Sequence, residues 1–204
     1  MSLARLTRRI ALGAALALIA GAGLAAITAR QPDDMALGSP RAPVTVIEYG
    51  SVGCPHCAAW NNDVFPAFKA RYVDTGRVRY VLREILTGDQ SIAAAGFMLA
   101  RCAGPAKYFQ VVDAVFHRQS SMLGAPAGAV LQEIAKQVGM SDAAFQACID
   151  DQKGLEAVNA RSQRHADQDK VDSTPTFFVN GRRLDGEQTL AQLAQAIRAA
   201  RRRR

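Results

Sequence analysis

The chain has 204 residues, of which 49% are hydrophobic and 21% are charged, a composition typical of a globular protein that can bury a core. Its formal charge of +7 suggests a nucleic-acid partner, but seven of the 25 basic residues lie at the two chain ends, at Arg5, Arg8, Arg9 and Arg201 to Arg204. The middle is close to neutral and has no basic stripe interleaved with aromatic residues, so we expect no nucleic-acid partner.

The N-terminus has the composition of an export signal. Its three arginines precede an uncharged run rich in Ala, Leu and Gly, residues 10–29, as in a secretory signal. Ile27-Thr28-Ala29 offers a cleavage site, and Thr7-Arg8-Arg9-Ile10 is similar to a twin-arginine signal. The run is also long enough to span a bilayer as an uncleaved anchor. We therefore assign residues 1–29 as a signal peptide or membrane anchor and residues 30–42 as a linker. The rest is expected in the periplasm, either free or anchored in the inner membrane through residues 10–29.

The exported part opens with a strand–helix–strand pattern. Val44 to Tyr49 is rich in β-branched residues between Pro43 and Gly50, which predicts a buried strand. A helix is expected from Cys57, with a kink at Pro66 inside its apolar pattern and an end at Gly76. Val78 to Glu84 predicts a second strand, parallel to the first and joined to it by a right-handed connection.

A helical block and a β-rich end follow. Helical spacing covers residues 91–102, 106–119, 127–138, 141–150 and 155–168, with breaks at glycine or proline between the earlier segments. Thr176 to Val179, the Asn180-Gly181 turn and Arg182 to Leu184 predict a hairpin, and residues 189–201 predict a closing helix. The pattern indicates one α/β domain with a helical insertion at about residues 88–168.

The Cys54-Pro55-His56-Cys57 motif carries the chemistry that the sequence indicates most strongly. Cys54 comes after a strand, where a helix begins, so unpaired backbone N–H groups and the positive end of the helix dipole favour a thiolate there. His56 adds a donor or a positive charge beside the sulfur. A stabilised Cys54 thiolate is a good leaving group, which makes the Cys54–Cys57 disulfide oxidising, and Cys57 is expected to be more buried and to resolve mixed disulfides.

Two other interpretations of the motif remain. Structural zinc sites use four ligands, but the other cysteines lie 46 residues apart and His117 and His165 have no ligand spacing, so we expect no metal. A purely structural disulfide within the motif is the other alternative. A second feature favours redox chemistry: Thr174-Pro175 precedes an aromatic-rich strand, and this proline is a candidate for a cis peptide bond or an ordinary proline at a strand start.

Taken together, the motif, the helical insertion and Thr174-Pro175 before Thr176-Phe177-Phe178-Val179-Asn180-Gly181 resemble the DsbA family of bacterial disulfide oxidoreductases. The resemblance covers about residues 38–200. It implies a thioredoxin fold over residues 43–200 with the helical insertion, followed by a basic tail at 201–204. A low pKa of the first cysteine and a strongly oxidising disulfide are family properties that it also implies.

The same resemblance assigns the site residues. It implies that Cys54 is the exposed attacking sulfur and that Cys57 resolves. Pro175 would form a cis-proline loop in which the backbone of Thr174 pairs with an extended substrate segment. Glu48 would be the family's acidic residue beneath the motif, able to move protons at Cys57, and an acid at a strand edge is the alternative. Thr174 departs from the valine of the best-known oxidase of the family and is more typical of the related isomerases.

Cys102 and Cys148, both in the predicted helical block, form a second pair. In an oxidising compartment they are expected to form a structural disulfide apart from the active site, and two free buried cysteines are the alternative. The sequence thus predicts a monomeric dithiol oxidase without a cofactor. Its partners would be exported proteins that contain cysteines, and the resemblance implies a DsbB-like membrane quinone reductase as a further partner. A reductase or isomerase, or a chaperone-like binding module, are the rival functions.

Overall fold

A computed structural model describes residues 31–123 and 127–203. The predicted signal peptide or anchor lies outside these residues. In the described part, no helix is long and apolar enough to cross a membrane.

A five-stranded sheet forms the centre of the fold, in the order β1-β3-β2-β4-β5. β2 (Val44–Gly50) and β3 (Val78–Glu84) are parallel and fully paired, as the strand–helix–strand pattern predicts. β4 (Thr176–Val179) runs antiparallel to β2, and β5 (Arg182–Asp185) pairs with β4. The Asn180-Gly181 turn joins the last two strands with φ of 45° and 86°, values that asparagine and glycine tolerate better than other residues.

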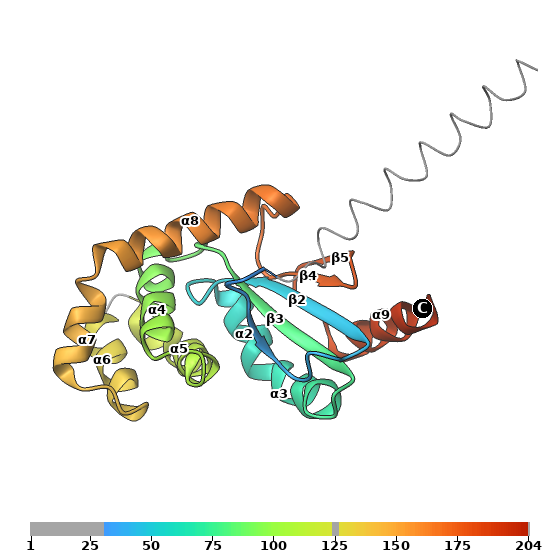
Figure 1. Cartoon of the computed structure of the whole chain (residues 1–204), viewed down its shortest axis with the longest axis horizontal. Coiled ribbons are helices and arrows are strands. Elements are labelled where there is room, and N and C mark those ends of the chain that lie inside the picture. The colour runs from blue at the N-terminus through green and yellow to red at the C-terminus, as the bar shows by residue number, and fades with distance from the viewer. Residues whose placement is uncertain (1–30, 124–126, 204) are drawn as a thin grey trace, which may run out of the picture.

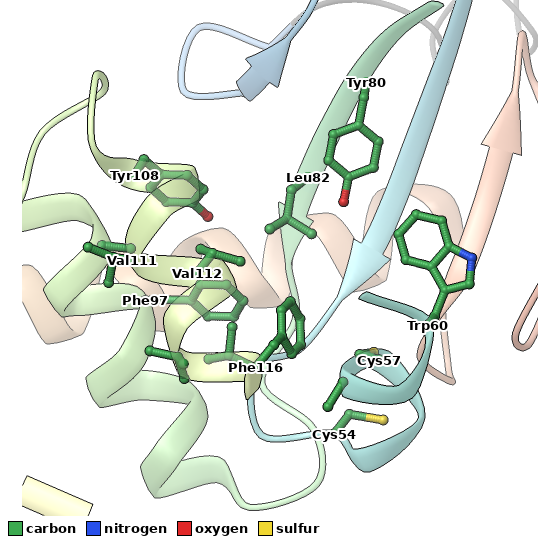
Figure 2. Close-up of a cluster of buried hydrophobic side chains, with 14 of the residues drawn as sticks. Cys54, Cys57, Trp60, Tyr80, Leu82, Phe97, Tyr108, Val111, Val112 and Phe116 are labelled. Atoms are coloured by element: carbon green, nitrogen blue, oxygen red, sulfur yellow. The ribbon is translucent and has the colours of Figure 1, made fainter. Parts of the chain in front are cut away.

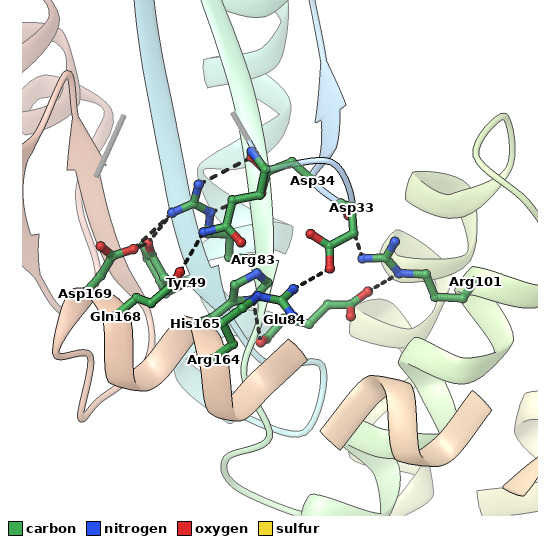
Figure 3. Close-up of polar contacts among 11 residues, drawn as sticks. Asp33, Asp34, Tyr49, Arg83, Glu84, Arg101, Arg164, His165, Gln168 and Asp169 are labelled. Atoms are coloured by element: carbon green, nitrogen blue, oxygen red, sulfur yellow. Dashed lines mark hydrogen bonds and ion pairs between the residues drawn. The ribbon is translucent and has the colours of Figure 1, made fainter. Parts of the chain in front are cut away.

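The prediction of a linker at residues 30–42 is wrong for its central part. Met35–Leu37 forms β1, an edge strand that pairs antiparallel with β3. Just before it, Asp34 forms an ion pair with the fully buried guanidinium of Arg83, at 3.0 Å. Figure 3 shows Asp34 and Asp169 on either side of Arg83, with Asp169 contributed by a distant helix. A strand of three residues is too short for a periodic pattern, which is why the sequence does not reveal it.

The helical connection between β2 and β3 also differs from the prediction. α2 (Pro55–Asp63) ends before Val64, α3 (Phe65–Phe68) begins anew, and a π-helix, η1 (Lys69–Val73), completes the connection. Pro66 therefore lies in the first turn of α3 instead of kinking a continuous helix. Proline fits there because it has no N–H group to bond and the first turn of a helix needs none.

Among the residues that the structure describes, five helices lie between β3 and β4, as the helical spacing predicts. Their bounds are Gln90–Cys102 (α4), Tyr108–Met122 (α5), Ala127–Gln137 (α6), Asp142–Ile149 (α7) and Gln152–Asp169 (α8). They form a block beside the sheet (Figure 1), and a disulfide between Cys102 and Cys148 joins α4 to α7. Two arginines of the block, Arg101 and Arg161, hold the buried carboxylate of Glu84 at the end of β3.

The core continues across both faces of the sheet. On one face, α2, α3 and η1 pack with α9 (Leu190–Arg202) against Val44, Val46, Phe177 and Val179. On the other, a smaller cluster of Ile47, Tyr49, Val81 and Phe178 meets Ala166 of α8. The larger cluster runs without a break from Trp60 and Cys57 into Val111, Val112 and Phe116 of α5 (Figure 2), so the sheet and the helical block share one core.

Candidate active site

The motif lies at the carboxyl end of β2. Cys54 is the N-cap residue of α2 in an extended conformation, and Pro55 occupies the first turn, where its missing N–H group has no cost. The backbone N–H groups of His56 and Cys57 have no partner within the helix at its first turn, and they help to lower the pKa of Cys54. The start of the helix thus places backbone N–H groups near one sulfur.

Close backbone contacts fix the loop between β2 and α2. A Cβ atom on Gly53 would lie 2.2 Å from the carbonyl oxygen of Asp89, so a larger residue does not fit there without a backbone shift. The N–H of Asp89 donates to the oxygen of Gly53 at 3.0 Å, and the hydroxyl of Ser51 donates to the carbonyl of Thr87 at 2.8 Å. The segment after β3 thereby holds the loop that carries Cys54.

Cys54 has the electrostatic environment of a thiolate. Its pKa is lowered from 9.0 to about 5, mainly because the Cys57 thiol donates a hydrogen bond to the Cys54 sulfur, with further donation from Thr174 and from the backbone at the helix start. Burial opposes this shift but does not outweigh it. Cys54 is only 6% exposed, so it is less open than the resemblance implies, yet it is the more accessible of the two sulfurs because Cys57 is completely buried.

Cys57 has the opposite environment. Burial is the main reason that its pKa lies well above 9.0, and the neighbouring charges of Glu48 and Cys54 raise it further. The N–H group of Ser51, at 3.4 Å from the Cys57 sulfur, is the contact that favours its charged form. The two sulfurs, one turn apart, are therefore held in different protonation states at neutral pH.

Glu48 lies beneath this pair in β2 and is 1% exposed, so it is not an acid at a strand edge. Its Oε2 accepts a hydrogen bond from the Tyr80 hydroxyl at 2.5 Å, and its Oε1 is buried without a hydrogen-bond partner among the described residues. Burial raises the pKa of Glu48 from 4.5 to about 8. A carboxyl with such a pKa can gain and lose a proton near neutral pH.

The loop before β4 completes the site. The Thr174-Pro175 peptide bond is cis, and the carbonyl oxygen of Thr174 lies 3.4 Å from the Cys54 sulfur. The Thr174 hydroxyl shares a 2.6 Å hydrogen bond with the hydroxyl of Thr87, from the segment that also holds Ser51. Residues 120 positions apart thus meet at one sulfur.

His56 lies at the surface above the motif. Its Nδ1 is 2.6 Å from Oε1 of Glu187, and the two side chains are 74% and 44% exposed. The backbone N–H of His56 helps to lower the pKa of Cys54, whereas from the sequence we expect the imidazole ring to do so. The ring instead connects the motif to the segment before α9.

Several residues of the site have no signal in the sequence. Tyr80, Thr87 and Gln119 reach Glu48, Thr174 and the Cys54 backbone from separate elements. Trp60 donates from its indole N–H to the carbonyl oxygen of Gln188, which ties α2 to the loop before α9. The Tyr80–Glu48 contact is the exception. The alternation of side chains along Val78 to Glu84 places Tyr80 on the same face of the sheet as Glu48.

The second cysteine pair lies elsewhere. Cys102 and Cys148 are bonded to each other within the helical block, whereas Cys54 and Cys57 are free thiols. Within residues 31–123 and 127–203, no group of three or more histidine, cysteine or acidic side chains is arranged to hold a metal ion. The arrangement at Cys54 and Cys57 is suited to thiol–disulfide exchange.

Comparison with known proteins supports this interpretation. A sequence model described as Thioredoxin matches residues 30–199. A Rickettsia typhi protein, named provisionally as a protein-disulfide oxidoreductase, is 35% identical over 151 residues, which make up 73% of this chain and 55% of that protein. A similarly named Rickettsia bellii protein is 32% identical over 151 residues and is covered to 58%. The chain thus spans little more than half the length of these relatives.

Solved structures are matched over nearly their whole length, at lower sequence identity. Wolbachia pipientis alpha-DsbA1 superposes with a TM-score of 0.79 at 26% identity, over 87% of this chain and 95% of that one. Chlamydia trachomatis DsbA has the same fold, with a TM-score of 0.74 at 18% identity over 86% and 95% of the two chains. The chain therefore belongs to the thioredoxin family, and its fold is similar to that of DsbA proteins.

Proposed function

We propose that this protein is an exported dithiol oxidase that introduces disulfide bonds into newly exported proteins through Cys54 and Cys57. The observation that carries the proposal is the contrast between the two sulfurs: the pKa of Cys54 is lowered to about 5 and that of Cys57 is raised. A stabilised thiolate favours the reduced enzyme over the disulfide, which makes the disulfide a strong oxidant.

The reaction begins with the oxidised enzyme. A client thiolate attacks the Cys54 sulfur, the Cys54–Cys57 bond breaks, and Cys57 leaves with the electron pair and takes up a proton. A second client thiolate then attacks the client sulfur of the mixed disulfide, and Cys54 leaves as a thiolate. The client gains a disulfide and the enzyme gains two electrons, with Cys54 as the good leaving group.

Glu48 supplies the proton that Cys57 needs. Its raised pKa of about 8 keeps it protonated at neutral pH, and its charge is close enough to affect the pKa of Cys57. The buried Oε1 without a partner is the atom available for this transfer. Without a proton source, a buried Cys57 thiolate would be a costly leaving group because burial disfavours its charge.

The Thr174-Pro175 loop is where we place the client. The Thr174 carbonyl faces the Cys54 sulfur at 3.4 Å, so an extended client segment that pairs with the Thr174 backbone would bring its cysteine to Cys54. Such pairing uses main-chain groups, which allows clients of many sequences. Pro175 itself is buried just before β4, and Thr174 is partly exposed there.

Export and reoxidation complete the proposal. The basic and apolar residues 1–29 support export to the periplasm, where the chain is either released or kept at the inner membrane. The reduced enzyme must pass two electrons to an acceptor, and the DsbA-like fold supports a DsbB-like membrane quinone reductase in this role. We propose that the protein acts as a monomer.

A redox titration against glutathione tests the direction of the reaction. We expect the Cys54–Cys57 disulfide to be more oxidising than glutathione and to oxidise a reduced client protein, with no transfer by a Cys54→Ser variant. A potential well below that of glutathione would refute the oxidase. Transfer that persists in Cys54→Ser would refute the assignment of Cys54.

Thr174 favours a second candidate, a reductase or isomerase. Its hydroxyl contributes to the lowered pKa of Cys54, so it belongs to the active site. An isomerase would rearrange a scrambled client faster than it oxidises a reduced one, and comparing these two rates separates the candidates. A chaperone-like module would bind clients equally well when both cysteines of the motif are replaced.

A further inference from the structure

Gln119 connects the helical block to the loop that carries Cys54. It lies near the C-terminal end of α5, and its side chain is only 4% exposed. Its Nε2 donates to the carbonyl oxygen of Val52 at 2.7 Å and to that of Cys54 at 3.2 Å. An amide nitrogen has two hydrogens, so both donors of this side chain are used on the backbone of the motif loop.

The surroundings of Gln119 make this arrangement costly unless both bonds form. Its neighbours on α5, Val115, Phe116 and Met122, belong to the apolar core that also contains the two motif cysteines, and Figure 2 shows Phe116 on the side of α5 that faces this cluster. A polar side chain in such a place loses its hydration and its rotamer freedom. The paired hydrogen bonds to the loop offset that loss.

The other carbonyl groups of the loop have partners of their own. The oxygen of Ser51 accepts from the N–H of Cys54 at 3.1 Å, and that of Gly53 accepts from Asp89 at 3.0 Å. The oxygen of Cys54 also accepts the first helical bond of α2, from Ala58 at 3.1 Å. Gln119 therefore holds the same carbonyl group that starts the helix, and so fixes the first turn of α2 relative to α5.

We propose that Gln119 is a positioning residue for the thiol chemistry: it holds the Val52 and Cys54 carbonyl oxygens and so fixes the place of the Cys54 sulfur at the first turn of α2. This inference rests on the proposed function, because it concerns the same cysteine. It gives the helical block a direct role in the reactivity of the motif. The side chain itself touches neither the client nor the reacting sulfur.

The test is a thiol titration of the full-length reduced protein. Gln119→Met keeps the length of the side chain and removes both donors. We expect the pKa of Cys54, measured by the ultraviolet absorbance of the thiolate, to rise by about one unit, because the sulfur loses its fixed place at the positive end of α2. The equilibrium constant with glutathione should shift about tenfold towards the disulfide, since one pKa unit corresponds to a factor of ten.

Asn61→Ala is the matched control. Asn61 of α2 donates to Asp113 of α5 at 3.0 Å, so its loss loosens the same pair of helices without touching the loop carbonyl groups. We expect this variant to melt at a lower temperature with an unchanged Cys54 titration. If Asn61→Ala moves the titration as much as Gln119→Met, general packing of α2 on α5 explains the effect and the proposal is overturned.

A second variant covers the case in which Gln119→Met does not fold. Gln119→Asn keeps the amide but shortens its reach by one methylene group, so it cannot bond both carbonyl oxygens in place, and the same rise in the pKa of Cys54 is expected. A wild-type titration curve in either folded variant would refute the role of Gln119. The titration needs no client, so failure of the oxidase proposal in the transfer assay leaves this result separate.

Discussion

Replacing Cys54 with serine in the reduced protein tests the electrostatics of the motif. A group whose folded pKa lies below its unfolded value binds its proton less tightly in the folded state. It stabilises the fold at high pH, and this stabilisation is lost as the pH falls through the folded pKa. For Cys54 the two values are about 5 and 9.0, so the loss should occur on acidification from neutral pH towards pH 4.

The magnitude follows from these two values. At pH 7 the thiolate lies two pKa units above its folded pKa, which corresponds to about 3 kcal/mol of stabilisation at 1.36 kcal/mol per unit. At pH 4 the thiol is protonated in both states and contributes about 0.1 kcal/mol or less. Serine does not ionise in this range, and it affects packing equally at both pH values. The destabilisation caused by Cys54→Ser should therefore be about 3 kcal/mol larger at pH 7 than at pH 4.

Chemical denaturation of both proteins at the two pH values provides the measurement. The same reductant is used for both, so the state of Cys102 and Cys148 is the same in each pair of samples. Equal destabilisation at pH 7 and pH 4 would show that Cys54 is not held as a thiolate. It would also remove the main support for an oxidising disulfide.

Three further substitutions test other parts of the structure. Glu48→Gln should stabilise the fold by about 3 kcal/mol at pH 7. The reason is that a carboxyl whose pKa is raised from 4.5 to about 8 destabilises the fold progressively as the pH rises through that interval. The gain in stability should vanish at pH 4, and a gain that is the same at both pH values would argue against the raised pKa. Arg83→Met should lower the free energy of unfolding in urea by about 3–5 kcal/mol, since it leaves the carboxylates of Asp34 and Asp169 buried without this cation. A loss below about 1 kcal/mol would show that these two ion pairs are dispensable. Replacing Cys102 and Cys148 together by alanine should lower the free energy of unfolding by about 4 kcal/mol, as expected for a disulfide that closes a loop of 46 residues. The reduction potential of the Cys54–Cys57 disulfide should stay unchanged. A changed potential would show that the two cysteine pairs are coupled.

Local signals in the sequence predict much of the fold. The β-branched run before the motif, the Asn180-Gly181 turn and the placement of Cys54 at a helix start each depend on a few neighbouring residues. The N-cap of α7 is equally local, because the hydroxyl of Ser141 accepts from the N–H of Ala144 three positions on. Such features are predictable because the interactions that form them lie within a few positions of the chain.

The features that the sequence does not reveal depend on distant partners. Arg83 lies in a strand whose pattern suits either face, and the two carboxylates that pair with it when it is buried, Asp34 and Asp169, come from 49 and 86 positions away. β1 exists because β3 offers an unpaired edge, and three residues carry no period of their own. Gln119 reads as one polar residue of an amphipathic helix. Nothing near it in the sequence indicates that its amide faces inward, towards residues 52–54.

These distant contacts indicate that the helical insertion does more than cover the sheet. An insertion that only covered the sheet would touch it through apolar side chains, whereas this one reaches the motif loop at three points. The backbone of Asp89 binds Gly53, Gln119 binds Val52 and Cys54, and a Cβ atom on Gly96 of α4 would lie 2.8 Å from Val52. Because β2 fixes the loop from one side and the insertion from the other, the direction of the first turn of α2 is set by both. The proposal for Gln119 makes the reactivity of Cys54 a property of the interface between sheet and insertion, which a four-residue motif alone does not specify.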